Sequence, residues 1–345
     1  MVLLVPIIGG VVALGLLVWC CVCRRKRSSD DEPTRPPDTS SLDTAAKSLG
    51  FLETLLTDDR VLIRRRFDIR DIQFERPLSK GAFGEVWLCT DRQNTMLAVK
   101  KLLQHKNDAY KEIKDFIAEI QLTASLDHPH IIRFLGVAWT SMDNLCMALE
   151  YLPTGDLLAF LRQNADMLTW VKDKLPMALG VAHALEYLHN RPTPIIHRDV
   201  KAKNVLLTEQ LQTKLIDFGI SRDRTQETMT AGVGTPYWSA PEVLEGNRYT
   251  EKSDIYSFGV LLSEIDSAAT PYKDVRSPET GEPLRVWQIV SMIVGGSLRP
   301  TFSDACPQRI ARVAKACLDG DPNVRPSANE VIEMLLGRAV SDQNW

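Results

Sequence analysis

The sequence predicts an α+β fold of two lobes, a β-rich lobe followed by an α-rich lobe, preceded by one transmembrane helix. Three observations support this prediction. Residues 67–150 contain several short runs of strand-forming residues and one helical stretch. After Gly155 the apolar residues recur at helical steps almost to the end of the chain, and residues 2–23 carry no charged side chain. Two such lobes enclose a cleft between them.

The composition is that of an ordinary globular protein. The chain has 345 residues, enough for about two compact units. Its 41 basic and 44 acidic residues leave a net charge of −3. This near-neutral balance gives no indication of a nucleic-acid partner, which would require a basic face. The number of cysteines, seven, is odd, and those after the apolar stretch are scattered singly, so no disulfide framework is indicated.

The apolar stretch over residues 2–23 is long enough to span a bilayer. At about 1.5 Å per residue, such a helix covers about 30 Å, the thickness of the hydrocarbon core. The cations of residues 24–27 (RRKR) follow at once and place that end in the cytoplasm. A cleaved secretory signal is the alternative, but its basic leading segment and small-residue cleavage site are missing. We therefore expect a single-pass membrane protein with everything after residue 23 in the cytoplasm.

The apolar stretch also bears on partners within the bilayer. Gly9 and Ala13 have the small-residue spacing of some helix dimers, although membrane helices are rich in glycine in any case. Only Met1 precedes the stretch. We therefore expect signals to arrive through a dimer or a receptor partner, or through an ectodomain encoded upstream.

The region between this stretch and the globular part is predicted to be a tether. Residues 28–41 are polar, contain proline and lack apolar periodicity, which indicates a flexible linker. Residues 42–56 predict a short amphipathic helix, and the arginines at 64–66 either contact acidic lipid headgroups or lie in a solvated loop. The expected divisions are a membrane helix (1–23), a juxtamembrane linker (24–66), a globular domain (67–337, with lobes 67–150 and 153–337) and a tail (338–345).

Apolar periodicity predicts the elements of each lobe. Strands are expected at 72–74, 85–90, 96–101 and 146–150, with a helix at 110–125 between the third and fourth. Helices are expected at 157–164, 174–189, 252–267, 284–294, 308–319 and 328–336. The first lobe is thus mostly sheet and the second mostly helix.

A glycine pair lies between the first two predicted strands, in the run KGAFGEV at 80–86. Without Cβ atoms, Gly81 and Gly84 allow backbone N–H groups to approach phosphate oxygens, although such pairs commonly mark only a hairpin. Lys100 ends the third predicted strand, and its cation could reach the same phosphates. Glu119 lies on the following helix, where it could pair with Lys100. As isolated residues, both types are more often solvated.

Three further runs carry the strongest signal: HRDVKAKN at 197–204, DFG at 217–219 and APE at 240–242. They resemble the catalytic loop, the metal-binding triplet and the end of the activation segment of the eukaryotic protein kinases, in the family's order and spacing. Asp254 and Arg325 also occupy typical family positions. The resemblance covers residues 72–336, and other runs are similar to the tyrosine-kinase-like group. It implies the bilobal protein kinase fold, with serine/threonine-type catalytic motifs.

The resemblance implies transfer of the γ-phosphoryl group of ATP to a protein hydroxyl. Asp199 would accept the proton of that hydroxyl or orient it for attack. Lys201 would steady the transferring group. Lys100, aligned by Glu119, would hold the α- and β-phosphates. Catalysis would then consist mainly of positioning and charge neutralisation.

By the same resemblance, Asn204 and Asp217 are the Mg²⁺ ligands, because that ion requires hard oxygen atoms. Leu149 would be the gatekeeper, and Glu150 and Leu152 would present hinge backbone groups to the adenine. The complete predicted ATP-binding set, besides Lys100, is Leu78, Ser79, Lys80, Gly81, Ala82, Phe83, Gly84, Glu85, Val86, Ala98, Leu149, Glu150, Leu152 and Leu206.

Two runs bear on the substrate. Lys201 within HRDVK, and GTPYW at 234–238, are similar to serine/threonine kinases, with dual specificity as the main alternative.

A nucleotide-binding pseudokinase scaffold is a second alternative, but such proteins generally lose at least one of the catalytic lysine and aspartates, which are all present here. An oxidoreductase with a glycine loop is excluded, because no parallel βαβ unit follows. Protein substrates and ATP are the expected partners.

Phosphorylation of the activation loop is expected to regulate the activity. Arg198 directly precedes Asp199, which in this family marks kinases whose loop phosphate neutralises that arginine and orders the loop. The loop offers Thr225, Thr228 and Thr230 as acceptors. A threonine-rich polar loop can equally be a solvated linker.

The chain departs from the family pattern at two positions. Ser79 stands where the first glycine of the loop is usual, which keeps a small side chain but restricts φ and could change ATP affinity modestly. Thr123, one turn after Glu119, replaces a usual apolar residue. This replacement could loosen the active arrangement and make activity more dependent on phosphorylation or on a partner.

Overall fold

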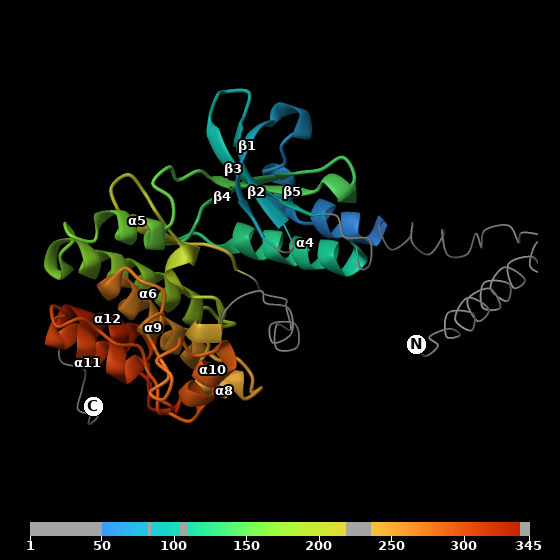
Figure 1. Ribbon diagram of the computed structural model, residues 1–345. Coiled ribbons are helices and arrows are strands. Elements are labelled where there is room, and N and C mark those ends of the chain that lie inside the picture. The colour runs from blue at the N-terminus through green and yellow to red at the C-terminus, as the bar shows by residue number, and fades with distance from the viewer. Residues whose placement is uncertain (1–49, 82–83, 104–108, 219–235, 339–345) are drawn as a thin grey trace, which may run out of the picture. The chain divides into compact units, whose positions relative to one another are not determined.

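The computed structural model describes residues 50–81, 84–103, 109–218 and 236–338. A β-rich lobe comes first and a helical lobe follows, as the sequence predicts (Figure 1). The predicted membrane stretch, Ala82, Phe83, Gly219 and the three activation-loop threonines lie outside the described residues. Over the four ranges given above, no helix combines the length and the apolar character needed to cross a membrane.

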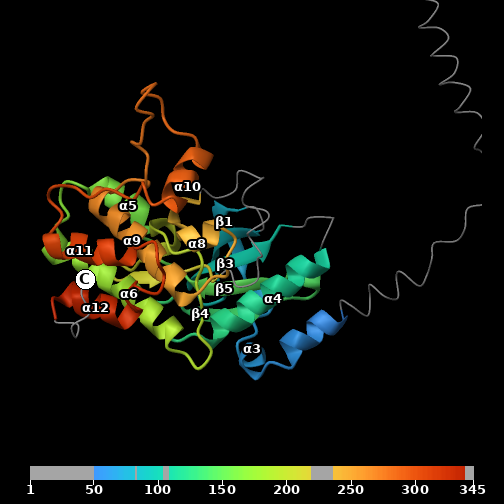
Figure 2. The ribbon, with the colours of Figure 1, turned by 90° about the horizontal axis from the view of Figure 1, so that it is seen from below.

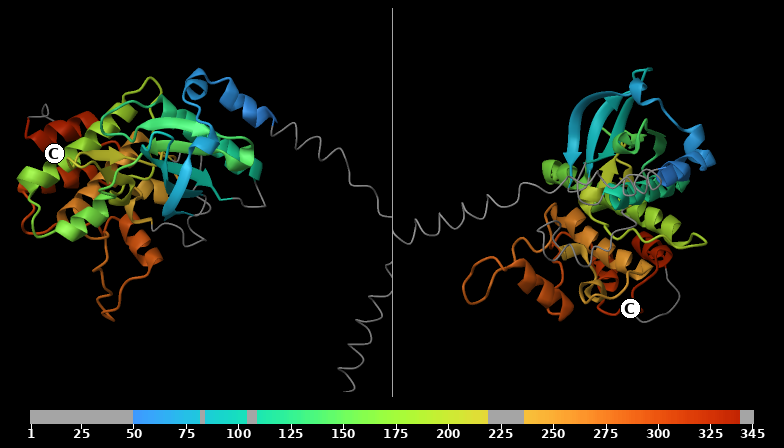
Figure 3. Two further views of the ribbon diagram at one scale, coloured as in Figure 1. Left: turned by 90° about the horizontal axis from the view of Figure 1, so that it is seen from above. Right: turned by 90° about the vertical axis from the view of Figure 1, so that its right-hand side faces the viewer.

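The first lobe is built on an antiparallel sheet of five strands in the order β1-β2-β3-β5-β4. The strands are β1 (Gln73–Lys80), β2 (Gly84–Thr90), β3 (Met96–Leu102), β4 (Phe134–Ala138) and β5 (Cys146–Glu150). Helix α4 (Ala109–Ser125) packs against β3 and β4 (Figures 1 and 3). The sequence predicts β2, β3, β5 and α4 to within one residue at each end, predicts β1 only over its start (72–74), and does not predict β4. Its residues FLGVA are almost all buried, so the alternation typical of a half-exposed strand is missing.

The strand register decides which side chains of the sheet face the second lobe. Val86 pairs with Lys100, and Ala98 pairs with Leu149, so these four side chains share one face of the sheet. From this face Lys100 reaches Asp217 of the second lobe. Val86, Ala98 and Leu149, which are three of the predicted nucleotide contacts, therefore point into the space between the lobes.

The second lobe consists mainly of helices packed around α9. The elements are α5 (Leu157–Asn164), α6 (Leu175–His189), β6 (Val205–Leu207), β7 (Thr213–Leu215), α8 (Pro241–Leu244), α9 (Glu251–Ser267), α10 (Val286–Val294), α11 (Gln308–Cys317) and α12 (Ala328–Leu336). In α9, 14 of the 17 residues are buried, which makes it the centre of this lobe rather than a surface helix. Helices α5 and α12 have their predicted bounds, and the other long helices differ by one or two residues.

Capping residues in the sequence explain where these helices begin and end. The Asp156 side chain accepts a hydrogen bond from Ala159 N and so starts α5. Ser327 and Glu330 form a reciprocal capping box at the start of α12. Gly337 follows α12 with a φ of 74°, a left-handed conformation that favours glycine.

A buried ion pair joins the end of the predicted activation segment to the last two helices. The Arg325 side chain is fully buried and donates to both carboxylate oxygens of Glu242, at 2.8 and 2.7 Å. It also donates to the carbonyl oxygens of Lys252 and Asp319. Since a buried charge is tolerated only when it is paired, this arginine fixes α8 against the loop before α12.

The folded part of the chain begins before the predicted boundary at residue 67. A helix covers residues 50–57, and α3 (Arg60–Arg64) follows it, with Asp59 as the N-cap. Leu52, Leu56 and Leu62 are fully buried in the hydrophobic core of the first lobe. Figure 2 shows this segment beside α4. Residues 50–66, which the sequence analysis assigns to the linker, thus pack on the first lobe. The helix predicted at 42–56 is present over its described residues, 50–56, although periodicity alone does not say which surface its leucines cover.

Candidate active site

The run at 197–204 connects α6 to β6 and is held by α9. Asp254, fully buried on α9, accepts hydrogen bonds from the backbone N–H groups of His197 and Arg198, both at 2.8 Å. It also contacts His189 Nε2 at 2.9 Å. Arg198 has a φ of 69°, a conformation that costs a non-glycine residue about 1–3 kcal/mol. The bonds to Asp254 hold the backbone in this turn.

Asp199, Lys201 and Asn204 lie together at the end of this run. Lys201 Nζ contacts both carboxylate oxygens of Asp199, at 2.8 and 2.9 Å. Asn204 Nδ2 donates to the Asp199 carbonyl oxygen and to its Oδ2, both at 2.8 Å. The carboxylate of Asp199 is thus fixed in orientation by two side chains from its own loop, as a group that positions a hydroxyl requires.

Lys100 links the two lobes through its ammonium group. Its Nζ donates to Glu119 Oε1 on α4 and, at 2.9 Å, to Asp217 Oδ1, two residues after β7. Burial tends to lower the pKa of Lys100, but the charges of Asp217 and Glu119 outweigh it and raise that pKa above its ordinary value. Lys100 is therefore a cation at neutral pH, the form that binds phosphate oxygens.

Asp217 and Phe218 are locked to the catalytic run by His197. The Phe218 ring is buried and packs edge-on against the His197 ring, with 5.3 Å between the centroids. His197 Nε2 lies 2.9 Å from the carbonyl oxygen of Ile216. Asp217 has a φ of 66°, and this turn directs its carboxylate towards Lys100. The two runs that the sequence analysis singled out are therefore one structural unit.

The available donor atoms are two oxygen atoms, which suit Mg²⁺ better than a metal ion whose ligands are all protein side chains. Asn204 uses its amide nitrogen towards Asp199, so Oδ1 is the atom it can offer to a metal, and Asp217 offers a carboxylate. Among the described residues there is no group of three or more histidine, cysteine, aspartate or glutamate side chains that could hold a metal ion. Mg²⁺ commonly takes one or two protein oxygens and completes its shell with phosphates and water. The residues present therefore fit this ion.

At the hinge, some of the backbone N–H and C=O groups are already hydrogen-bonded within the protein. Glu150 N donates to Arg133 O at 3.1 Å, and Gly155 N donates to Leu152 O at 3.3 Å. This directs the predicted adenine contacts to the Glu150 carbonyl and the Leu152 N–H. The Glu150 carboxylate binds Lys214 at 2.8 Å and does not need to contact a nucleotide. Leu206 on β6 is half-buried, as is Leu149.

The two described ends of the glycine loop, Gly81 and Gly84, lie close together. Gly81 N donates to Gly84 O at 2.8 Å. A Cβ atom on Gly84 would lie 2.8 Å from the carbonyl oxygen of Lys101, so a side chain is excluded there. Leu78, Ser79 and Lys80 form the exposed end of β1. This part of the chain can approach a ligand with its backbone.

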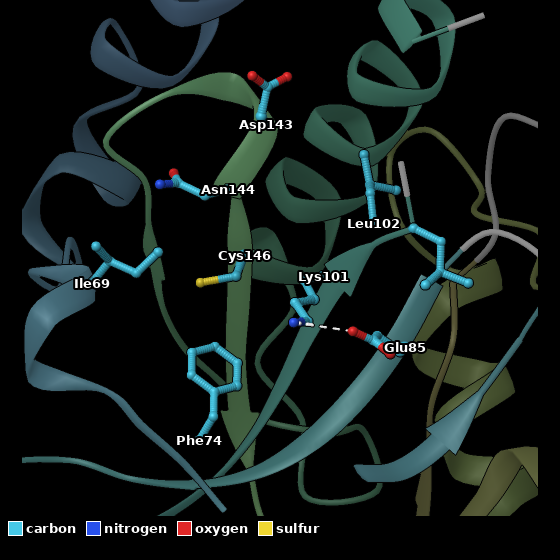
Figure 4. A pocket seen from close by; sticks show the side chains of 9 residues that line it. Ile69, Phe74, Glu85, Lys101, Leu102, Asp143, Asn144 and Cys146 are labelled. Atoms are coloured by element: carbon cyan, nitrogen blue, oxygen red, sulfur yellow. Dashed lines mark ion pairs between the residues drawn. The ribbon is translucent and has the colours of Figure 1, made fainter. Parts of the chain in front are cut away.

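Glu85 differs from the other predicted nucleotide contacts in the direction of its side chain. It forms an ion pair with Lys101 at 3.0 Å. Both line a separate pocket of about 350 Å³, together with Phe74 and Cys146 (Figure 4). This pocket belongs to the face of the sheet opposite Lys100, since neighbouring residues of a strand alternate in direction. The predicted ATP contact of Glu85 is therefore not supported for its side chain.

The two departures from the family pattern are accommodated locally. Ser79 lies within β1 opposite Val86 and outside the left-handed region, so it does not need the φ freedom of glycine. Thr123 is buried, and its hydroxyl donates to the carbonyl oxygen of Glu119 at 2.7 Å. Its polar group is thus satisfied within α4. The expected effects of these residues on ATP affinity and regulation remain predictions.

Comparison with known proteins agrees with this geometry. Residues 72–335 match the family described as protein tyrosine and serine/threonine kinase. The chain belongs to the protein kinase family. The probable serine/threonine-protein kinases drkB and drkA of Dictyostelium discoideum are each 35% identical over 268 residues, which is 78% of this chain but 37% and 40% of theirs. A probable LRR receptor-like protein kinase of Arabidopsis thaliana is 32% identical over 323 residues, 90% of this chain and 36% of that protein. The kinase chain thus spans less than half the length of these relatives.

Glu264 is a site residue of this kinase that the sequence analysis did not identify. From α9, its Oε2 accepts hydrogen bonds from Ala202 N in the catalytic loop and from Trp238 Nε1 after the activation segment, at 2.9 and 2.8 Å. Burial raises the pKa of Glu264 to about 7, against the weaker opposing effect of these hydrogen bonds. The only signal in the sequence is one acidic residue within the apolar run GVLLSEI. Glu264 ties the loop that carries Asp199 to the segment before α8.

This raised pKa predicts a pH-dependent stability. The folded state keeps a proton on Glu264 that the unfolded chain, with an ordinary pKa of 4.5, releases. The resulting stabilisation is fully present below pH 4.5 and is lost as the pH rises through about 7. In denaturant unfolding, Glu264→Gln should therefore lose less stability than the wild type between about pH 5 and 8. The exposed Glu245→Gln control should follow the wild type, and equal slopes in all three proteins would contradict this role of Glu264.

Proposed function

We propose that this chain is an active protein serine/threonine kinase that transfers the γ-phosphoryl group of ATP to hydroxyl groups of proteins. The observation that carries this proposal is the arrangement of Lys100 between Glu119 and Asp217, with Asp199 oriented nearby by Lys201. A pseudokinase scaffold, which transfers no phosphate, does not need these residues or the hydrogen bonds between them. Each relative matches this chain over less than half of its own length. The similarity therefore supports the activity of the kinase domain alone.

The proposed mechanism relies on positioning and charge. The Asp199 carboxylate orients the substrate hydroxyl and takes its proton, while Lys201 lies beside the carboxylate to meet the transferred group. Lys100 binds phosphate oxygens in its cationic form. Asn204 and Asp217 would hold Mg²⁺, which supplies neutralisation of the phosphate charge when bound.

Serine and threonine are the proposed acceptors, with tyrosine as the alternative in a dual-specificity enzyme. Support comes from Lys201, two residues after the catalytic aspartate, and from the similarity to drkA and drkB, which are probable serine/threonine-protein kinases.

We further propose control through the activation loop. Arg198 stands next to Asp199, and the threonines at 225, 228 and 230 are the proposed phosphate acceptors. Phosphate mapping of the loop after incubation with Mg·ATP tests this proposal. Full activity of the protein with all three threonines replaced by alanine would count against it.

We also propose that the stretch at 2–23 anchors the kinase as a single-pass protein with its catalytic domain in the cytoplasm. The support is the length of the uncharged run and the four cations after it. A dimer or receptor partner would then bring the signal. Alkaline carbonate extraction of expressing cells should leave the chain in the membrane fraction, and its release would contradict an integral anchor.

The activity itself is tested with Asp199→Asn. This change keeps the size of the side chain but removes its ability to take a proton, so phosphate transfer should fall by roughly 10²–10⁴-fold. The assay follows labelled phosphate from Mg·ATP into a basic protein substrate, followed by phosphoamino-acid analysis. Wild type should label serine and threonine, and the exposed Asp304→Asn control should match it. Unchanged labelling by the Asp199 variant would contradict the assignment, and labelled tyrosine would establish dual specificity.

A further inference from the structure

Residues 50–66 lie before the part of the chain that matches the kinase family, yet they pack into its first lobe. The family match begins at residue 72. Leu52 and Leu56, one helical turn apart in the helix over residues 50–57, are both 0% exposed. Phe51 of the same helix is 55% exposed. The helix therefore has one face committed to the lobe and one face in solvent.

The surface that this helix covers includes α4 and also Trp139 after β4, whose indole N–H donates to Glu53 Oε1 at 3.3 Å. Leu52 and Leu56 share one hydrophobic cluster with Ile117 and Ile120 of that helix. The side chain of Gln121 donates through Nε2 to the carbonyl oxygen of Leu55 at 3.1 Å. Figure 2 shows the segment alongside α4. Two of these α4 residues, Ile120 and Gln121, directly follow Glu119, the residue that binds Lys100.

A second attachment fixes the other end of the segment to β4. Val137 N donates to Arg65 O at 3.0 Å, and Phe67 N donates to Val137 O at 2.9 Å. A Cβ atom on Gly136 would lie 2.1 Å from the carbonyl oxygen of Arg65, so the two backbones can approach only because that residue is glycine. The Arg66 guanidinium lies 3.7 Å from the centre of the Trp139 indole ring. Held at both ends, the segment is a fixed support and not a tether.

We propose that the helix over residues 50–57 is a positioning element for catalysis, which holds α4 so that Glu119 stays bound to Lys100. This inference rests on the proposed kinase function. Leu52 and Leu56 touch no reacting group and act through α4. Without them, the apolar face of α4 would lose its cover, and the population of molecules with Glu119 beside Lys100 would fall. The chain before the family-matched domain would then set the activity of that domain.

The test uses the full chain and compares three variants with the wild type. Leu56→Ala removes the buried contact, Leu56→Met restores apolar volume at the same position, and Phe51→Ala removes an exposed apolar side chain from the same helix. Steady-state kinetics are measured well below the unfolding temperature, and hydrogen exchange is measured for α4 and for α9. We expect Leu56→Ala to lower kcat/KM for ATP by roughly tenfold and to speed amide exchange in α4 but not in α9. Leu56→Met and Phe51→Ala should resemble the wild type.

A second comparison separates positioning from simple destabilisation. In a Glu119→Gln background, Leu56→Ala should cause little further loss of kcat/KM, because the pair that the helix protects is already broken. An equal loss in both backgrounds would overturn the proposal. So would faster exchange in α9 to the same degree as in α4, or wild-type kinetics for Leu56→Ala. If the wild type itself transfers no phosphate, the kinase function fails, and the exchange of α4 still decides whether the helix supports it.

Discussion

The site depends on one cation that both lobes bind. The Lys100 ammonium contacts a carboxylate from α4 and another from the start of the activation segment. Lys100 is half-buried, and partial removal of its ammonium from water costs less when both carboxylates pair with it. Counted with Asp199 and Lys201, the five charges sum to −1. A site of this kind attracts a divalent cation, and a bound cation would in turn favour the phosphates of a nucleotide.

The second lobe supplies the rigid base for this arrangement through α9. Two of its acidic side chains, Asp254 and Glu264, are buried and accept hydrogen bonds from the catalytic loop. Asp254 accepts two backbone N–H bonds, and Glu264, whose pKa is raised to about 7, accepts one. The loop keeps the strained turn at Arg198 because a central helix defines where its N–H groups point. The catalytic groups are thus positioned by α9, which contributes none of the catalytic side chains itself.

The sequence predicts much of this, and the exceptions have physical causes. Most helices of the second lobe were predictable because their apolar residues follow a 3.6-residue period, whereas α9 is buried on nearly all sides. The Lys100–Glu119 pair was predictable from the family motifs. Strand β4 is buried almost throughout and shows no alternation. Leu52 and Leu56 indicate a helix, but periodicity does not say which surface their face will cover. Glu264 is hidden within an apolar run, where its function depends on a loop more than 60 residues away in the chain.

Lys100 and Glu119 are expected to act as one unit, and a double-mutant cycle on phosphate transfer tests this most directly. The values of kcat/KM for ATP are measured for the wild type, Lys100→Met, Glu119→Gln and the double variant. If Glu119 acts through Lys100, the double variant should be about as slow as Lys100→Met alone. Losses that multiply in the double variant would show that the two residues contribute independently, and would contradict the central role given to their ion pair.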